Sequence, residues 1–167
     1  MRKFPLNRKI LHLTFAVMCL TLTLPRAASS QATSTTTNQF VPFALSVFVP
    51  CANDGLGETV QVSGTLHIQN HVTINQKHIT LKTLFQPQGA TGLGVITGDV
   101  YRGTGVTQFL DTIPNVNGAT TFTFINNFRF IGPGPDNNLQ IHQNVQSTIN
   151  ANGEITSVVN NTSIVCN

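Results

Sequence analysis

One stretch of the chain constrains the fold more than any other. From position 60 to position 74 the even positions are apolar with few exceptions, whereas the odd positions are polar. The even positions are Val60, Val62, Gly64, Leu66, Ile68, Asn70, Val72 and Ile74. Successive side chains of a strand point to opposite faces, so this period of two predicts an antiparallel strand with one buried and one wet face. Because a straight strand of this length would span on the order of 50 Å, we expect a bend or bulge at Gly64 or Asn70.

The following segment, 78–86, predicts the partner of this strand. Placing Ile74 opposite Ile79 puts Asn70 opposite Thr83 and Ile68 opposite Phe85, so the apolar faces of the two strands coincide.

Further runs with strand-like alternation follow along the chain. They are an apolar run over 43–49 that ends at Pro50, a glycine-rich strand over 95–108, a phenylalanine stripe over 120–130, and alternating strands over 138–149 and 155–166. The loop Ala151-Asn152-Gly153 has the composition of a three-residue hairpin turn. It predicts Ile149 beside Ile155, Val145 beside Val159 and Leu139 beside Val165.

The first thirty residues differ from the rest. Arg2, Lys3, Arg8 and Lys9 precede an apolar stretch over 10–24, and a run of small residues ends at Ser30. This layout is typical of a signal peptide, and the apolar stretch is shorter than the roughly 20 residues that a transmembrane helix needs. We therefore expect a signal peptide over 1–30, a flexible Thr- and Ser-rich leader over 31–40 and a single all-β domain over 41–167. The protein would be secreted, periplasmic or at the cell surface, with no stable membrane insertion after cleavage.

Two cysteines remain outside the expected signal peptide. Cys51 follows the first strand and Cys166 is the next-to-last residue. An exported chain meets an oxidising compartment, so we expect a Cys51–Cys166 disulfide. A link between the first and last strands favours an antiparallel meander of seven to eight strands closed into a barrel, with a two-sheet β-sandwich as the alternative.

Charge and composition narrow the functional classes. Beyond position 30 the chain has four basic residues against six acidic ones, a net charge of −2, so we expect no nucleic-acid partner. No motif predicts a cofactor. His67 and His71 lie four residues apart on one strand, roughly 13 Å, which is too far for two ligands of one metal ion, so we expect no metal site.

Two groups of residues are candidate sites. Asp99, Tyr101 and Arg102 form the densest group of reactive side chains, either as part of a pocket or as an ion pair beside a partly buried tyrosine. Asn70 and Asn126, together with Gln143 and Asn161, occupy faces that otherwise look interior. They line a polar pocket or, as we prefer, mark bulges where the face assignment flips.

Several runs carry a resemblance. The segments Ser63–Ile68, Asn126–Arg129 and Ile149–Gly153 resemble those of small exported bacterial all-β proteins that are known only as uncharacterised. The segment Tyr101-Arg102-Gly103-Thr104-Gly105 is similar to the tyrosine- and glycine-rich strand of allene oxide cyclase and dirigent-type barrels. The first resemblance implies an exported β domain and the second a barrel, and neither transfers a site residue.

Together these features favour a non-enzymatic exported β-barrel that has a binding, surface or structural role. The alternative is a carrier or cyclase-type barrel that holds a small apolar molecule. The partner would be such a molecule or a component of the cell surface. The sequence does not indicate an oligomeric state.

Overall fold

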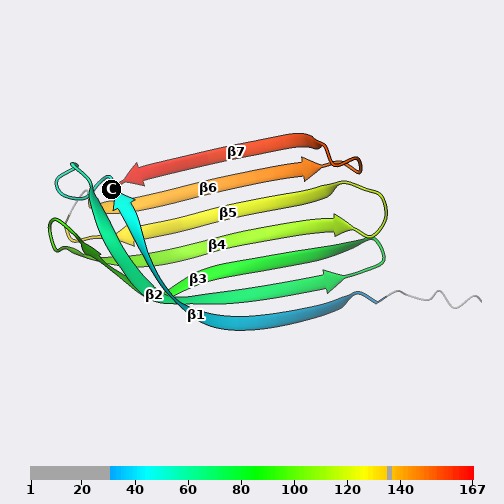
Figure 1. The fold of residues 1–167 in the computed structure, drawn as a ribbon, viewed down its shortest axis with the longest axis horizontal. Helices are drawn as coiled ribbons and strands as arrows, with labels where there is room; N and C mark the ends of the chain where they lie inside the picture. The colour runs from blue at the N-terminus through cyan, green and yellow to red at the C-terminus, as the bar shows by residue number, and fades with distance from the viewer. Residues whose placement is uncertain (1–30, 135–136) are drawn as a thin grey trace, which may run out of the picture. The chain divides into compact units, whose positions relative to one another are not determined.

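The computed structural model describes residues 31–134 and 137–167, so the expected signal peptide lies outside the described residues. In the described part, seven antiparallel strands form one sheet in which each strand pairs with its neighbours in sequence (Figure 1). The strands are β1 Thr33–Val49, β2 Glu58–Ile74, β3 His78–Gly94, β4 Val100–Pro114, β5 Thr120–Ile131, β6 Asn138–Ile149 and β7 Ile155–Cys166. The predicted all-β antiparallel meander is therefore confirmed.

The first strand is longer than predicted. β1 begins at Thr33 and pairs with β2 along its whole length, from Thr33 opposite Ile74 to Val49 opposite Glu58. The prediction of a flexible leader is thus wrong over most of its length. The segment lacks apolar periodicity, but threonine suits an extended backbone and the long edge of β2 offers hydrogen bonds.

The hairpin of β2 and β3 has the predicted register. Ile74 lies opposite Ile79, Asn70 opposite Thr83 and Ile68 opposite Phe85. The register shifts at Gly64, between Ser63 and Thr65, as expected, but the extra residue lies in β3 between Gln88 and Thr91. The ladder continues without a shift through Asn70.

The register of β6 and β7 differs from the prediction beyond the turn. Asn150 pairs with Glu154 and Ile149 with Ile155, as expected. A register shift between Thr148 and Ile149 then moves the remaining partners by one residue, so that Leu139 lies opposite Cys166 instead of Val165. A bulge adds one residue to one strand only, and the apolar pattern of β7 tolerates either register.

The sheet is not closed into a barrel, and it is not a two-sheet sandwich. β1 pairs with β2 alone and β7 with β6 alone among the described residues. Figure 1 shows the end of β1 turning towards the end of β7, where Cys51 and Cys166 form the predicted disulfide, with Cα atoms 5.5 Å apart. A disulfide fixes one point, whereas a barrel needs a continuous ladder of hydrogen bonds between its first and last strands.

The two faces of the sheet differ in character. We call the face that carries Leu66, Phe85, Phe109, Phe124 and Val145 the concave face, and the opposite face the convex face. The fully buried core lies at the disulfide end of the concave face. It contains Val49, Cys51, Ala52, Val60, Val62, Tyr101, Phe130 and Leu139. Away from that end, most concave side chains are only half-buried.

Candidate functional site

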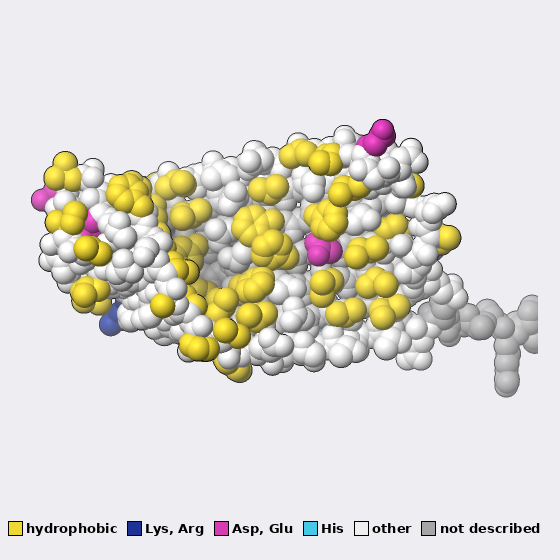
Figure 2. Space-filling model, viewed as in Figure 1, with side chains coloured by type: hydrophobic (Ala, Val, Ile, Leu, Met, Phe, Trp, Pro, Cys, Tyr) yellow, Lys and Arg dark blue, Asp and Glu magenta, His cyan; other side chains and the backbone are white. Residues whose placement is uncertain are grey.

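An apolar hollow lies on the concave face, next to the buried core. It has a volume of about 340 Å³ and is lined by side chains from β1 to β5. The lining residues are Phe43, Leu45, Val62, Leu66, Phe85, Pro87, Thr107, Phe109, Phe124, Phe128 and Phe130. We call this hollow the concave groove. Figure 2 shows hydrophobic side chains gathered along this side of the sheet, around a hollow in the surface.

Phenylalanine rings form the wall of the concave groove. The ring centroids of Phe109 and Phe124 lie 4.8 Å apart, and those of Phe85 and Phe109 lie 5.7 Å apart in an edge-to-face arrangement. Aromatic pairs prefer such offset and edge-to-face contacts, so the rings hold one another in place. Phe109 is nevertheless 41 % exposed. Phe122, which lies beside Phe124 on the concave side of β5, is 37 % exposed. The groove is thus an ordered apolar surface that remains in contact with solvent.

Two asparagines interrupt the apolar character of the concave face. The Thr83 hydroxyl donates to Asn70 Oδ1 at 2.8 Å, and the Thr107 hydroxyl donates to Asn126 Oδ1 at 2.9 Å. No register shift occurs at Asn70 or Asn126, so the prediction of bulges at these two positions is wrong. A hydrogen bond from the adjacent strand instead offsets the cost of placing each amide on an apolar face.

The other two residues of that group, Gln143 and Asn161, lie on opposite faces of the sheet. Gln143 lies opposite Asn126 on the concave face. Asn161 lies opposite Asn144 on the convex face, because the bulge near the β6–β7 turn shifts β7 by one residue.

A carboxylate also lies on the concave face. Asp111 lies between its neighbours Leu81 of β3 and Phe122 of β5. In β4 it follows Phe109 by two residues, towards the end of the sheet that is remote from the disulfide. Asp111 is half-buried. A charge beside apolar side chains is costly unless it is paired or solvated, and Asp111 keeps part of its surface in contact with solvent.

A second group of polar residues lies at the disulfide end. Glu58 is buried, with 1 % of its surface exposed, although it begins β2 on the apolar face. The backbone N–H groups of Ile96 and Thr97 donate to Glu58 Oε2 at 3.0 and 3.1 Å, and the Thr97 hydroxyl donates to Oε1 at 2.8 Å. The Tyr101 hydroxyl lies 2.7 Å from Asn137 Oδ1 and 3.2 Å from Glu58 Oε1, so its proton serves both acceptors.

These contacts shift two pKa values in opposite directions. Burial alone raises the pKa of Glu58, but the hydrogen bonds from Thr97, Ile96 and Tyr101 together hold the pKa below its usual value. Burial raises the pKa of Tyr101 to about 12, and the nearby Glu58 carboxylate adds to the shift. The cluster therefore combines an ionised carboxylate with a neutral phenol, and both groups are held by hydrogen bonds.

The candidate group Asp99, Tyr101 and Arg102 is only partly brought together. Asn137 Nδ2 donates to Asp99 Oδ2 at 3.2 Å, which links Asp99 to Tyr101 through Asn137. Arg102 is exposed and follows Tyr101 directly in β4, so it points to the convex face, away from this cluster. The predicted grouping holds for Asp99 and Tyr101 and fails for Arg102.

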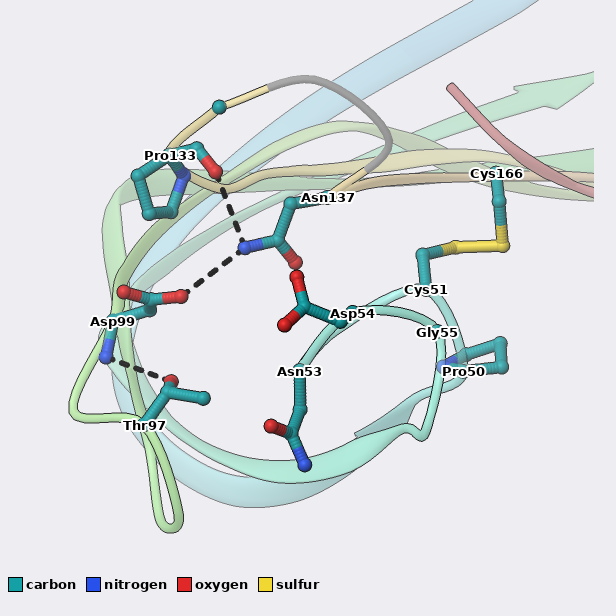
Figure 3. A pocket seen from close by; sticks show the side chains of 11 residues that line it. Pro50, Cys51, Asn53, Asp54, Gly55, Thr97, Asp99, Pro133, Asn137 and Cys166 are labelled. Carbon is teal, nitrogen blue, oxygen red and sulfur yellow. Dashed lines mark hydrogen bonds between the residues drawn. A yellow bond between two sulfur atoms is a disulfide. The ribbon is translucent and has the colours of Figure 1, made fainter.

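A polar cavity of about 830 Å³ lies beside this cluster and the disulfide. Figure 3 shows Asp54, Asp99 and Asn137 directed into it, with the Cys51–Cys166 disulfide at its rim. No group of three His, Cys, Asp or Glu residues that could hold a metal ion is present among the described residues. Because the hydrogen bonds of Glu58 and Tyr101 tie the turn after β3 to β2 and to Asn137, we assign the cluster a structural role.

Sequence reasoning missed Glu58 and Asn137. Glu58 occupies an even position at the start of the period-two run, so an acidic residue on the apolar face was a usable signal. Asn137 lies in the Gly- and Pro-rich loop between β5 and β6, where no periodicity reveals which way a side chain points.

Comparisons with known proteins give no relative. Neither a family model, nor a curated protein, nor a solved structure matches the chain significantly. The resemblance to exported bacterial proteins and to cyclase-type barrels therefore stays a prediction. In the part of the chain that the structure describes, no helix is long and apolar enough to cross a membrane.

Proposed function

We propose that the protein is a non-enzymatic binding protein that holds a small apolar molecule in the concave groove. The observation that supports this proposal is the ordered wall of half-exposed phenylalanines around a hollow of about 340 Å³. Ligand sites are concave, mostly apolar and on the order of 300–1,000 Å³, and exposed apolar surface of this kind marks a binding surface.

The ligand class follows from the polar groups around the groove. The apolar body of the molecule would contact Phe85, Phe109 and Phe124, while a polar or cationic end reaches Asp111. Asn70 and Asn126 supply further hydrogen-bonding groups on the same face. An amphiphilic molecule fits this arrangement better than a sugar, because the chain has no tryptophan and the groove is lined by phenylalanine.

We further propose that the protein acts after export, in the periplasm, at the cell surface or outside the cell. The charge and apolar pattern of the first thirty residues supports export. The Cys51–Cys166 disulfide supports an oxidising compartment, because such bonds form and persist there.

Native mass spectrometry of the exported protein, purified without detergent, tests whether a ligand is bound. A bound mass that is lost on denaturation is expected, and it identifies the class of molecule directly. A bare mass, together with no binding of apolar probes to the purified protein, would contradict the proposal and leave a structural or surface role.

Titration with an environment-sensitive fluorescent probe tests the place of binding. Phe109→Ala removes a ring from the concave groove and should weaken probe binding by roughly tenfold, since burying a phenylalanine side chain is worth about 1.5–3 kcal/mol. Phe40→Ala is the matched control, because Phe40 is also exposed but lies on the convex face beside His67. Equal losses in both variants would place the probe outside the groove.

A further inference from the structure

In the part of the chain that the structure describes, β7 is a sheet edge that pairs with β6 alone. Every residue of β7 is exposed, and the strand contains no charged residue and no proline. Natural edge strands are normally guarded by charge, proline, bulges or a covering element, since their free backbone groups pair readily with another strand. The bulge near the β6–β7 turn leaves the ladder from 157 to 166 regular.

The backbone of β7 has donors and acceptors that point outward at known positions. Asn138 and Asn167 exchange two backbone hydrogen bonds of 3.0 Å, so Asn167 faces β6. Because successive residues of a strand turn these groups to opposite sides, the odd-numbered residues of β7 face β6. The even-numbered residues, from Val158 to Cys166, direct N–H and C=O away from the sheet.

The other edge of the sheet is guarded. Asn75 donates to the carbonyl of His78, so odd-numbered residues of β2 face β3. Thr65, the partner of Pro42, is therefore turned away from β1, and the nitrogen of Pro42 is turned away from β2 towards the open edge. Proline cannot donate there, which blocks a continuous ladder at the middle of β1. An added strand is thus favoured at β7 and not at β1.

The sequence of β7 is complementary to itself when reversed. With Asn161 on a two-fold axis, Val158 faces Ile164 of the second copy and Asn160 faces Thr162 of the second copy. These four side chains lie on the concave face, so apolar meets apolar and polar meets polar. Val158 and Ile164 are 63 % and 59 % exposed in the single chain, so the pairing covers apolar surface as well as backbone groups.

We propose that the protein forms a two-fold symmetric dimer through antiparallel pairing of β7 with β7 of a second copy. Such an interface uses the same surface on both copies and closes after two chains. It places the concave faces of the two sheets on the same side of one continuous sheet. The proposal is independent of what the concave groove binds.

Crosslinking through an introduced cysteine tests the register. Asn161 pairs with its own counterpart at a position without hydrogen bonds, where Cα atoms lie about 4.5 Å apart, within the range of a disulfide. Asn161→Cys should therefore give a covalent dimer under mild oxidation. Ser163→Cys is the matched control on the same face, because residue 163 is offset from its counterpart by four residues, roughly 13 Å. Similar yields for the two variants, or none for either, would overturn the proposal.

A charge-pair experiment distinguishes loss of the dimer from loss of the fold. Sedimentation of the wild-type protein should show a dimer, whereas Asn161→Lys and Asn161→Asp should each sediment as monomers, because like charges meet on the axis. Mixing the two variants should restore a dimer that contains one copy of each. A monomeric wild type across the concentration series, or no dimer in the mixture of folded variants, would contradict the proposal.

Discussion

Tyr101 connects the two sides of the polar cluster at the disulfide end. Its hydroxyl donates to Glu58 and Asn137. Its ring packs edge-to-face against Phe130, with the ring centroids 6.5 Å apart. Its two hydrogen-bond partners come from the start of β2 and from the β5–β6 connection. Ionisation of this buried phenol would place a second negative charge beside the Glu58 carboxylate. Loss of the Tyr101 proton should therefore destabilise the packing at the disulfide end of the sheet.

The first prediction concerns the titration of Tyr101, which is the sole tyrosine in a chain without tryptophan. In the folded protein its pKa is raised to about 12 from the usual 10. The neutral phenol thus contributes stability that is fully present below pH 10 and is lost as the pH rises through 12. Ultraviolet absorbance of tyrosinate should show a midpoint near 12 in buffer and near 10 in denaturant. Equal midpoints would show that the hydroxyl is exposed.

The second prediction concerns the charge on the concave face. Asp111→Asn removes the carboxylate between Leu81 and Phe122 while keeping its size. A cationic amphiphile should bind roughly five- to tenfold more weakly to this variant, about 1–1.4 kcal/mol for a half-buried ion pair, whereas a neutral apolar probe should bind as before. Glu154→Gln, in the β6–β7 turn, is the control and should change neither affinity. Parallel losses for both probes would indicate a structural effect of the substitution.

At the level of elements, register could be predicted wherever the two faces of a strand differ strongly. β2 has a strict alternation, so slipping β3 by one residue would expose its apolar face, and the predicted pairing of Ile68 with Phe85 is confirmed. β7 carries valines at both 158 and 159 and asparagines at both 160 and 161. The side-chain pattern of such a strand is compatible with two registers relative to β6. The bulge near the β6–β7 turn sets which of the two is formed.

The third prediction concerns Gly64, which lies opposite the bulge that β3 forms between Gln88 and Thr91. A Cβ atom on this residue would lie 2.9 Å from the Cα of Ala90 on the neighbouring strand and 3.2 Å from the Phe43 ring. Backbone must then move, so Gly64→Ala should lower the free energy of unfolding by roughly 1–3 kcal/mol, as overpacking typically does. Ser63→Ala, at the exposed neighbouring position, should cost far less. Urea denaturation of both variants measures the difference, and equal stabilities would mean that β3 yields freely at Ala90.

For the whole molecule, closure was the feature that local patterns could not decide. The alternation of each strand is the same in an open sheet and in a barrel, because closure depends on whether the first and last strands meet. Here the Cys51–Cys166 disulfide links the turn after β1 to the end of β7, and no β1–β7 ladder forms among the described residues. Asn70, Phe109 and Asn126 remain on an accessible concave face. The groove exists because the sheet stays open, which no single strand could have indicated.

The fourth prediction concerns the disulfide as the one covalent link between the two edges. Cys51 and Cys166 are 115 residues apart, and a loop of that length has an idealised entropic worth of roughly 4–5 kcal/mol in the unfolded chain. Cys51 belongs to the buried core together with Val49 and Ala52, so losing the bond also frees the segment that covers that core. The double variant Cys51→Ala/Cys166→Ala should lose roughly 2–5 kcal/mol of stability in urea denaturation. Hydrogen exchange should accelerate first at 49–57 and later in β4 and β5. Unchanged stability, or a uniform acceleration over all strands, would show that hydrogen bonding of the open sheet holds this end without the covalent link.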